Sequence, residues 1–462
     1  MPKLPDNPFA KLTLTEYGTQ LRRGEISAEI VTASLLQRIE ALNPKLGAYT
    51  FVARETALAA ARAIDALLKA GTDLGPLMGV PVAVKDLYFV ESMPLAAGSK
   101  LDVSDIVRSE GTFVRELRRN GCILLGKTWT SEFALGGINF IQHVPWNPLD
   151  EETHRTPGGS SGGSAVAMAA GLCAFALGSD TGGSVRMPAA MCGAFGHKFS
   201  RTAFPLDGVF PLSPTLDSLG TLTVSARDAA LIWSTLNESG AIAPAPLEGL
   251  KLGRPAQLFY DDLDPAVQSG IENAVQRLSR AGVRIVAVDA PEALEFEAVF
   301  GRIIPIELIA ILGRERVQAN LEIFDPVTRT RLAGALDQPT TDYIDALRRL
   351  AALRDTVARR MVECDAWITP TTPLLPTPMA ECATLDAALA WNRRALRNTR
   401  PGNVFDQCGV SLPLRLPGSR FAAGLQIMAS PGEDARLLAI ACALEAAFSS
   451  PRNLSDFVPT NS

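Results

Sequence analysis

Residues 157–186, PGGSSGGSAVAMAAGLCAFALGSDTGGSVR, are the stretch around which the chain is organised. They contain two serines flanked by glycine, Ser160 and Ser184, which lie 24 residues apart. The run between the two loops is almost wholly Ala, Val, Met, Leu and Gly. This composition predicts a closely packed, buried helix and strand that fix one serine loop relative to the other. We therefore expect the two loops to form one site.

Glycines bracket both serines and allow backbone angles that are closed to other residues. Such loops can aim successive N–H groups at one point, which is what an oxyanion requires. A flexible linker is the alternative, but a linker would not lead directly into a buried run and a second Gly-Gly-Ser. The glycines are Gly158, Gly159, Gly162 and Gly163 around the first serine, and Gly182 and Gly183 before the second.

The composition describes a globular protein with ample core. The chain has 462 residues, of which 47% are hydrophobic and 20% charged, and its net charge is −5. No block of five or more like charges is present, so nothing indicates nucleic acid or an anionic membrane as a partner. The N-terminus has no apolar signal segment, and the apolar stretch near Ala165 is too short to span a bilayer. A cytoplasmic protein is expected.

Cysteine and histidine give no clear metal or thiol site. The seven cysteines are dispersed without a C-x-x-C pair, which favours reduced core thiols over disulfides or zinc. Cys192 with His197 could be taken for a thiol site, and His143 with Glu151 and His154 for a metal site. With three histidines in the chain, loop or core positions explain them more simply.

Helix and strand patterns alternate, which predicts an α/β fold with a mixed, mostly parallel central sheet covered by helices on both faces. Ser27 can cap a helix that is expected to stop at Asn43-Pro44. Pro81 indicates that the strand at residues 79–84 begins at a sheet edge. The other expected strands are residues 122–125, 283–288 and 366–369, and the other expected helices are residues 55–70, 112–120, one opened by Pro265 and ended by Gly282, and most of 290–365.

Two motif matches do not carry their usual chemistry. Residues 121–128, GCILLGKT, match the P-loop pattern, but the residues between the glycines are themselves expected to be a strand, which cannot wrap phosphates. Residues 158–162, GGSSG, match the nucleophile elbow of α/β-hydrolases, which needs a preceding strand and a later histidine. Polar residues precede this match and His197 is the only later histidine, so a Ser-His enzyme is disfavoured.

The scarcity of histidine leaves open which group would deprotonate a serine. A lysine can do so if burial lowers its pKa enough to make the neutral amine available. Lys85 lies at the end of an apolar strand and is the candidate. The alternative is a surface lysine, or one paired with Asp86.

Several motifs together resemble the amidase signature family of Ser-Ser-Lys hydrolases. The GGSSGGS and DTGGS-x-R pieces in this order are highly specific, and the resemblance covers most of the chain. It implies one domain over residues 1–462, with a helical layer (1–75), a signature core (76–225) and a part that shapes the substrate pocket and completes the core (226–462). The matching motifs are VKD at 84–86, GKT at 126–128, EFA at 132–134, the block at 157–198, LDSLG at 216–220 and GLQI at 424–427.

The resemblance also implies roles for individual residues. Ser184 is the expected nucleophile, Ser160, which follows a cis peptide in the family, the proton relay, and Lys85 the base. The spacings of 75 and 24 residues between them agree with the family. No metal or organic cofactor is expected. The N–H groups of Thr181, Gly182, Gly183 and Ser184 are expected to form the oxyanion hole. Ser161, Asp180 and Arg186 are expected to support the catalytic residues. Phe133, Ala134 and Leu135 are expected to contact the substrate.

Two departures from the family pattern are visible. Where the family commonly has Gly-x-Lys-Pro-Thr and then Gly-Arg-Val, residues 196–202 are GHKFSRT. Trp129 stands where Asn is common. Neither change touches the three catalytic candidates, so hydrolysis is expected, but both argue against close similarity to a well-known subgroup.

The expected activity is hydrolysis of the C–N bond of a small, uncharged amide through an acyl-enzyme on Ser184. The pocket is expected within residues 290–410, which are apolar and contain Phe300, Phe324, Trp391 and Phe405. Carbamates, anilides and esters remain alternative substrates because the same chemistry cleaves them. Further alternatives are the A-type component of a glutamine-dependent amidotransferase, whose partner protein acts on charged tRNA, and a non-catalytic protein that keeps the fold. The expected partner is a small-molecule substrate, and a homodimer is compatible with the sequence.

Overall fold

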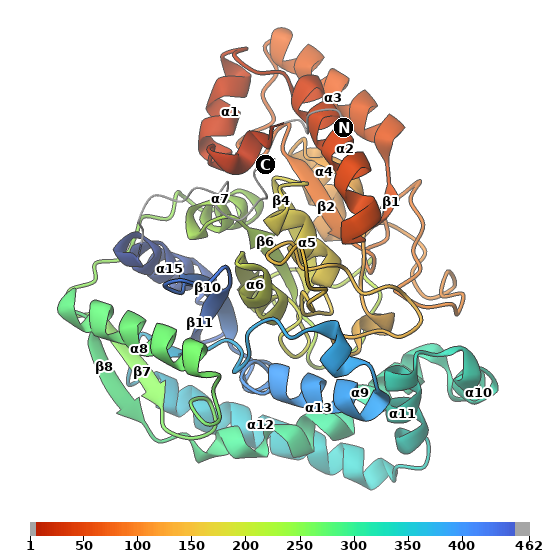
Figure 1. Ribbon diagram of the computed structural model, residues 1–462, viewed down its shortest axis with the longest axis vertical. Helices are drawn as coiled ribbons and strands as arrows, with labels where there is room; N and C mark the ends of the chain where they lie inside the picture. Colours follow the sequence, from red (N-terminus) through yellow and green to blue (C-terminus); the bar gives the residue numbers. More distant parts are fainter. Residues whose placement is uncertain (1–5, 449–462) are drawn as a thin grey trace.

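The computed structural model describes residues 6–448, and within them one sheet of eleven strands forms the centre (Figure 1). The strands are β1 Tyr49–Val52, β2 Pro81–Lys85, β3 Ile123–Thr128, β4 Phe175–Ser179, β5 Phe195–Lys198, β6 Leu219–Thr223, β7 Lys251–Pro255, β8 Arg284–Val288, β9 Ala366–Pro370, β10 Cys408–Arg415 and β11 Ala422–Ala429. Their order across the sheet is β1-β3-β2-β4-β6-β5-β10-β11-β9-β7-β8. Because β10 pairs with β5, early and late parts of the chain share one sheet, and the chain is a single α/β domain as predicted.

The sheet is mixed as predicted, but it is not mostly parallel. β2 is parallel to β3 and β4, and β7 is parallel to β8 and β9. The central pairings from β4 through β6, β5, β10 and β11 to β9 are antiparallel, as is β1 with β3. Loops without a helix join β5 to β6 and β10 to β11, so these two pairs are antiparallel, whereas a parallel pairing needs a long crossover. The pairings of β10 with β5 and of β11 with β9 join segments that are far apart in the chain.

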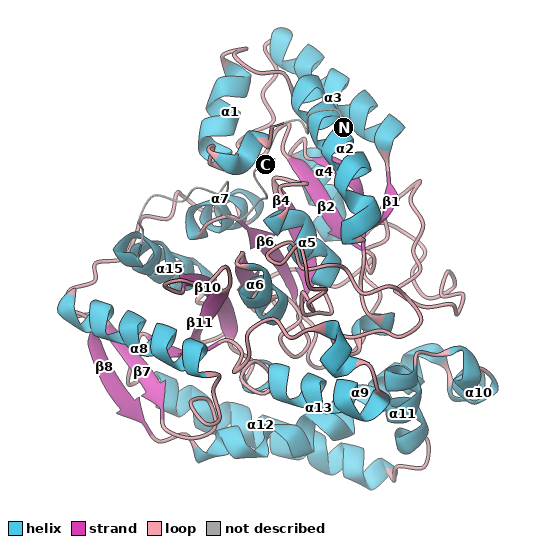
Figure 2. Cartoon of the chain, in the orientation of Figure 1, coloured by secondary structure: helices cyan, strands magenta, loops and turns pink. Residues whose placement is uncertain are grey.

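Helices cover both faces of the sheet (Figure 2). Every residue of β2, β4, β9 and β11 is buried, which requires a layer on each side. The helices are α1 Leu14–Arg22, α2 Ala28–Leu46, α3 Arg54–Lys69, α4 Thr112–Arg119, α5 Gly162–Ala169, α6 Arg186–Cys192, α7 Ala226–Leu236, α8 Pro265–Arg280, α9 Phe296–Leu312, α10 Arg314–Ala319, α11 Pro326–Ala335, α12 Thr340–Met361, α13 Leu385–Ala395, α14 Arg400–Val404 and α15 Asp434–Phe448. Among these helices, none is long and apolar enough to cross a bilayer.

The N-terminal layer differs from the prediction in two places. α2 begins after its predicted cap Ser27, but it continues through Pro44 to Leu46 and ends at Gly47, which has a φ of 61°. A proline in the last turn removes only one helical hydrogen bond, and the left-handed glycine then ends the helix. The short strand β1 follows, inside a region that was expected to be helical.

The predicted strand at residues 79–84 is β2, but it does not lie at a sheet edge. Pro81 is its first residue, a position where a sheet tolerates proline, and β2 lies between β3 and β4. The residues that resemble a P-loop form β3 and the turn before it, as predicted. The ends of strands β2 and β4 position the candidate catalytic residues.

Candidate active site

Lys85 is the last residue of β2, and its side chain is fully buried. Its Nζ lies 2.8 Å from Ser160 Oγ, 2.9 Å from Ser179 Oγ and 3.5 Å from the Ser179 carbonyl oxygen. β2 and β4 are parallel neighbours, so Lys85 and Ser179, which end them, meet at one edge of the sheet. The structure therefore brings Lys85 and Ser160 together and adds Ser179, which the sequence analysis missed although it immediately precedes the Asp-Thr-Gly-Gly-Ser motif.

Asp86 does not pair with Lys85. Its carboxylate lies 2.9 Å from the Nζ of Lys127, which also donates hydrogen bonds to the carbonyl oxygens of Tyr88 and Pro94. Lys127 is the lysine of the P-loop-like sequence, and these contacts hold it inside the fold. The alternative of a Lys85–Asp86 salt bridge is therefore wrong.

Burial lowers the pKa of Lys85 to about 7, although the carboxylates of Asp180 and Asp217 act in the opposite direction. A large fraction of this amine is therefore neutral near pH 7. A neutral amine has two N–H donors and one lone pair. The three oxygens around Nζ match this set when the Ser160 hydroxyl donates and the two Ser179 oxygens accept.

Close backbone packing holds the Ser160 loop in place. Ser160 is fully buried and follows a cis peptide bond after Gly159. A Cβ atom on Gly163, near the start of α5, would lie 2.4 Å from the Trp129 nitrogen and 2.5 Å from the Ala48 oxygen. Only a residue without a side chain lets α5 approach the end of β3 this closely. The glycines quoted from the sequence thus serve close approach as well as backbone freedom.

Ser184 lies in the loop between β4 and α6 and is 5% exposed. Its carbonyl oxygen accepts a hydrogen bond of 3.2 Å from the N–H of Ser161, so the two serine loops lie side by side. Ser161 Oγ donates to the Ser179 carbonyl oxygen at 3.4 Å. Within residues 6–448, no hydrogen bond joins the hydroxyl groups of Ser184 and Ser160.

The carboxylate of Asp180 organises the Ser184 loop. It accepts the N–H groups of Gly183 at 2.8 Å and Val185 at 3.1 Å, and it pairs with the Arg186 guanidinium at 2.9 Å. Burial alone would raise the pKa of Asp180, but Arg186 and the amide of Asn403 hold it below its ordinary value. Asn403 is distant in sequence, and no local pattern could have identified it.

The N–H groups expected to form the oxyanion hole are not equivalent. The N–H of Gly183 is occupied by Asp180, so it is not free to bind an oxyanion, contrary to the prediction. The N–H groups of Thr181, Gly182 and Ser184 have no hydrogen-bond partner among the residues that the structure describes. Three of the four predicted donors therefore remain available.

Asp217, in the LDSLG motif, anchors the start of the same loop. It accepts a hydrogen bond of 2.5 Å from the Thr181 hydroxyl and two of 2.9 Å from the N–H groups of Leu212 and Ser213. Burial raises the pKa of Asp217 to about 6 despite these bonds. The motif thus fixes the backbone at Thr181.

Phe133 and Ala134 have left-handed backbone angles, with φ of 52° and 61°. The Phe133 ring is buried between Phe210, whose centroid is 5.4 Å away, and Phe324, at 5.8 Å. Leu135 lines a pocket.

This pocket has a volume of about 320 Å³ and lies between Leu135 and the helices α9, α11, α13 and α14. Phe300, one of the four aromatic residues expected at the substrate pocket, lines it. Phe324 packs on Phe133 instead, Trp391 donates to Thr377 and Phe405 packs on Trp367. The pocket is also less apolar than predicted, because Arg331, Arg393, Arg400 and Glu297 line it.

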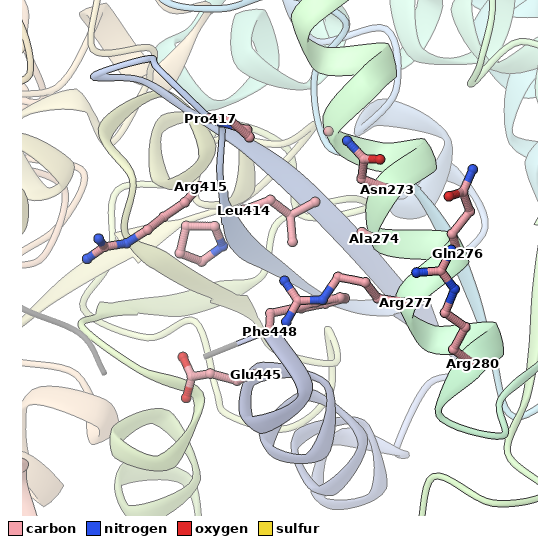
Figure 3. Close-up of a pocket in the computed structure, with 12 residues that line it drawn as sticks. Asn273, Ala274, Gln276, Arg277, Arg280, Leu414, Arg415, Pro417, Glu445 and Phe448 are labelled. Atoms are coloured by element: carbon pink, nitrogen blue, oxygen red, sulfur yellow. The ribbon is translucent and has the colours of Figure 1, made fainter. Parts of the chain in front are cut away.

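A second hollow of about 440 Å³ lies between α8, β10 and α15, with Arg277 and Arg280 on one side and Leu414 on the other (Figure 3). Arg277 stacks on the Phe448 ring at 5.4 Å. None of the residues around this hollow belongs to the serine loops or hydrogen-bonds to Lys85.

The histidines and cysteines have structural surroundings. His197 lies 3.2 Å from Asp434, and His154 stacks on Trp146 with ring centroids 4.7 Å apart. Cys192 is buried and contacts the Pro157 carbonyl oxygen. Among the described residues, no group of three or more His, Cys, Asp or Glu side chains is arranged to hold a metal ion.

Comparisons with known proteins agree on one family. The family model described as Amidase matches residues 30–438. The chain is 39% identical to 2-amino-5-chloromuconic acid deaminase of Comamonas testosteroni over 95% of this chain and 96% of the relative. It is 32% identical to the A-type component of the Glutamyl-tRNA(Gln) amidotransferase of Myxococcus xanthus over 94% and 96% of the two chains.

A solved crystal structure of an amidase superimposes on 95% of this chain and 100% of its own, with a TM-score of 0.85 and 30% identity. The match extends over both the serine loops and the variable helices, because nearly the whole of each chain is covered. The chain therefore belongs to the amidase family and is an amidase-type hydrolase of carbon–nitrogen bonds.

Proposed function

We propose that Ser184 is the nucleophile, that Ser160 relays its proton and that Lys85 is the base. The observation that carries this proposal is the contact of 2.8 Å between Lys85 Nζ and Ser160 Oγ, both fully buried. An amine with a pKa of about 7 can take up and return a proton at neutral pH, as a general base and acid must. The side chain of Ser184 must turn toward Ser160 when substrate binds.

The acylation step follows from this relay. Ser184 Oγ bonds to the carbonyl carbon while its proton passes to Ser160 Oγ and the Ser160 proton passes to Lys85 Nζ. The carbonyl π electrons move to oxygen, and this oxyanion faces the N–H groups of Thr181, Gly182 and Ser184. When the carbonyl re-forms, the C–N bond breaks and the leaving nitrogen receives the proton that Lys85 returns through Ser160.

The deacylation step repeats the relay with water in the place of the amine. Water attacks the acyl carbon and gives up a proton through Ser160 to Lys85. The bond between Ser184 Oγ and the acyl carbon then breaks, the proton returns to Ser184, and a carboxylic acid leaves. No cofactor enters either step.

A second candidate is hydrolytic deamination, favoured by 39% identity to a relative whose name describes a deaminase of 2-amino-5-chloromuconic acid. In such a reaction the imine tautomer of the amino compound adds water at carbon, and ammonia leaves to give a carbonyl. The neutral amine of Lys85 would accept a proton from the attacking water and return it to the leaving ammonia.

The test is a substrate panel on the purified full chain, in which release of ammonia, amine or, for the esters, alcohol is measured. The panel contains amides, anilides, carbamates, esters, 2-aminomuconic acid and glutamine, so that the amidotransferase alternative is included. We expect Ser184→Ala to lower turnover of every accepted amide, anilide, carbamate, ester or glutamine at least about 1000-fold, because these reactions need the acyl-enzyme. Ser164→Ala, which removes a hydroxyl of the same block that bonds to the Leu177 carbonyl oxygen, is the control and should keep turnover. Turnover of these acyl substrates that survives in Ser184→Ala would contradict the proposal, whereas deamination that survives alone would favour the second candidate.

A further inference from the structure

Three arginines surround the pocket beside the serine loops and have no acidic partner. Arg331, Arg393 and Arg400 come from α11, α13 and α14, and no ion pair or side-chain hydrogen bond to another described residue is formed by any of them. Arg400 is only 4% exposed, and its Nε is buried without a hydrogen-bond partner. Glu297 also lines the pocket and forms no ion pair with the arginines, although its charge acts to raise the pKa of Arg400. The Arg400 guanidinium lies over the Phe300 ring, 4.9 Å from its centroid.

Burying a cation without a counter-ion is unfavourable, and the positive charges of neighbouring arginines repel one another. Burial lowers the pKa of Arg400 to about 9, with a further contribution from the positive charge of Arg331. Burial likewise lowers the pKa of Arg331 to about 10, with a contribution from Arg393. Arg331 and Arg400 remain protonated at neutral pH, and the Arg393 side chain is exposed. An anion in the pocket would supply the missing charge and hydrogen-bond acceptors.

The pocket touches the loop that would hold the oxyanion. A Cβ atom on Gly182 would lie 2.5 Å from the Phe300 ring and 3.3 Å from Arg400 Cγ, so both side chains pack directly on the Gly182 backbone. Thr399, the residue before Arg400, donates a hydrogen bond of 2.8 Å to the Gly182 carbonyl oxygen. A group bound by the arginines would therefore lie beside the proposed reaction centre.

We propose that Arg331, Arg393 and Arg400 bind a carboxylate of the substrate, so that the natural substrate is a small anionic amide or amino compound. This inference rests on the proposed function, because it assigns the substrate class of the same site. A guanidinium binds a carboxylate through two parallel hydrogen bonds. Phe300, Leu135 and Ile304 supply apolar walls for a short carbon chain, and a volume of about 320 Å³ suits a small molecule.

The experiment compares pairs of amides that differ by one carboxylate. Succinamic acid is compared with butyramide, and glutaramic acid with valeramide, by ammonia release from the full chain. We expect kcat/KM of the wild type to be at least about 10-fold higher for one of the acids than for its neutral analogue. In Arg393→Gln this value should fall about 10- to 100-fold for the acid, with the neutral analogue changed less than about 3-fold.

A neighbouring arginine on the same helix provides the matched control. Arg394 pairs with Asp262 at 3.2 Å and does not line the pocket, so Arg394→Gln should leave both rates unchanged. Arg331→Gln and Arg400→Lys repeat the test from the other two helices, with circular dichroism as the check of folding. Equal kcat/KM for acids and neutral amides, with no selective loss in any arginine variant, would overturn the inference.

A second measurement separates this inference from the proposed function. A neutral fluorophosphonate should label Ser184 equally fast in the wild type and Arg393→Gln, because it does not need the arginines. Succinate or glutarate should slow labelling of the wild type, and Arg393→Gln should need at least about 10-fold more of the dicarboxylate. Labelling without any protection by dicarboxylates contradicts the arginine pocket alone. Labelling at a residue other than Ser184 contradicts the proposed function.

Discussion

The carboxylate of Asp86 lies 2.9 Å from the ammonium of Lys127, in a buried pair beside the reaction centre. Asp86 follows Lys85 in sequence, but its carboxylate pairs with Lys127. The Lys85 amine is therefore surrounded by hydroxyl and carbonyl oxygens. A lysine without a carboxylate in contact is the one whose pKa burial can lower furthest. The two neighbouring lysines therefore have different roles, one structural and one proposed to be catalytic.

We predict that Lys127→Met destabilises the protein by about 3–5 kcal/mol, because it leaves the buried Asp86 carboxylate unpaired. The free energy of unfolding from urea denaturation measures this loss. Lys251→Met on β7 changes a lysine of intermediate exposure and is the control, with an expected change below about 1 kcal/mol. A Lys127→Met protein as stable as the wild type would show that the pair contributes no stability.

We predict that Gly163→Ala lowers both stability and activity. The added Cβ would lie 2.4 Å from the Trp129 nitrogen, so α5 and the Ser160 loop must move, at a cost of about 1–3 kcal/mol. Gly334→Ala in α11 is the matched control, because nothing lies within 4 Å of its added Cβ, and it should be neutral or stabilising. Thermal unfolding and turnover of the accepted substrate test both variants. Equal behaviour of the two variants would argue against tight packing at α5.

We predict that kcat/KM rises with pH through an apparent pKa near 7. The sign follows from the base role, since the protonated Lys85 amine is inactive and loses its proton as pH rises through about 7. Below this value the rate should fall about tenfold per pH unit. Lys85→Met should lose activity at every pH. A flat profile between pH 5 and 9, or the same profile in an active Lys85→Met variant, would contradict the base role.

The sequence predicted the α/β class, the single domain and the loops around Ser160 and Ser184, because glycine and small apolar residues restrict what these segments can form. It could not predict the sheet order. The antiparallel centre depends on β10 and β11, far along the chain, pairing with β5 and β9.

In the candidate site, the glycine-rich loops could be predicted because their residues are local in sequence, whereas the roles expected for Lys85, Ser160 and Ser184 came from the resemblance to a family. Asn403 contacts Asp180, and Arg331, Arg393 and Arg400 line one pocket, only because separate helices converge. No local pattern distinguishes such arginines from those on solvated helix faces. For the same reason, the aromatic residues within residues 290–410 predicted a pocket that is more apolar than the one in the structure.

The roles proposed for Ser184 and Lys85 are tested most directly by the site of covalent labelling with a fluorophosphonate, mapped by peptide mass spectrometry on the folded protein. We expect an adduct on Ser184 that forms faster as pH rises through about 7 and is lost in Ser184→Ala and Lys85→Met. An adduct on Ser160 or Ser161, or labelling of Ser184 at an unchanged rate in Lys85→Met, would contradict these roles.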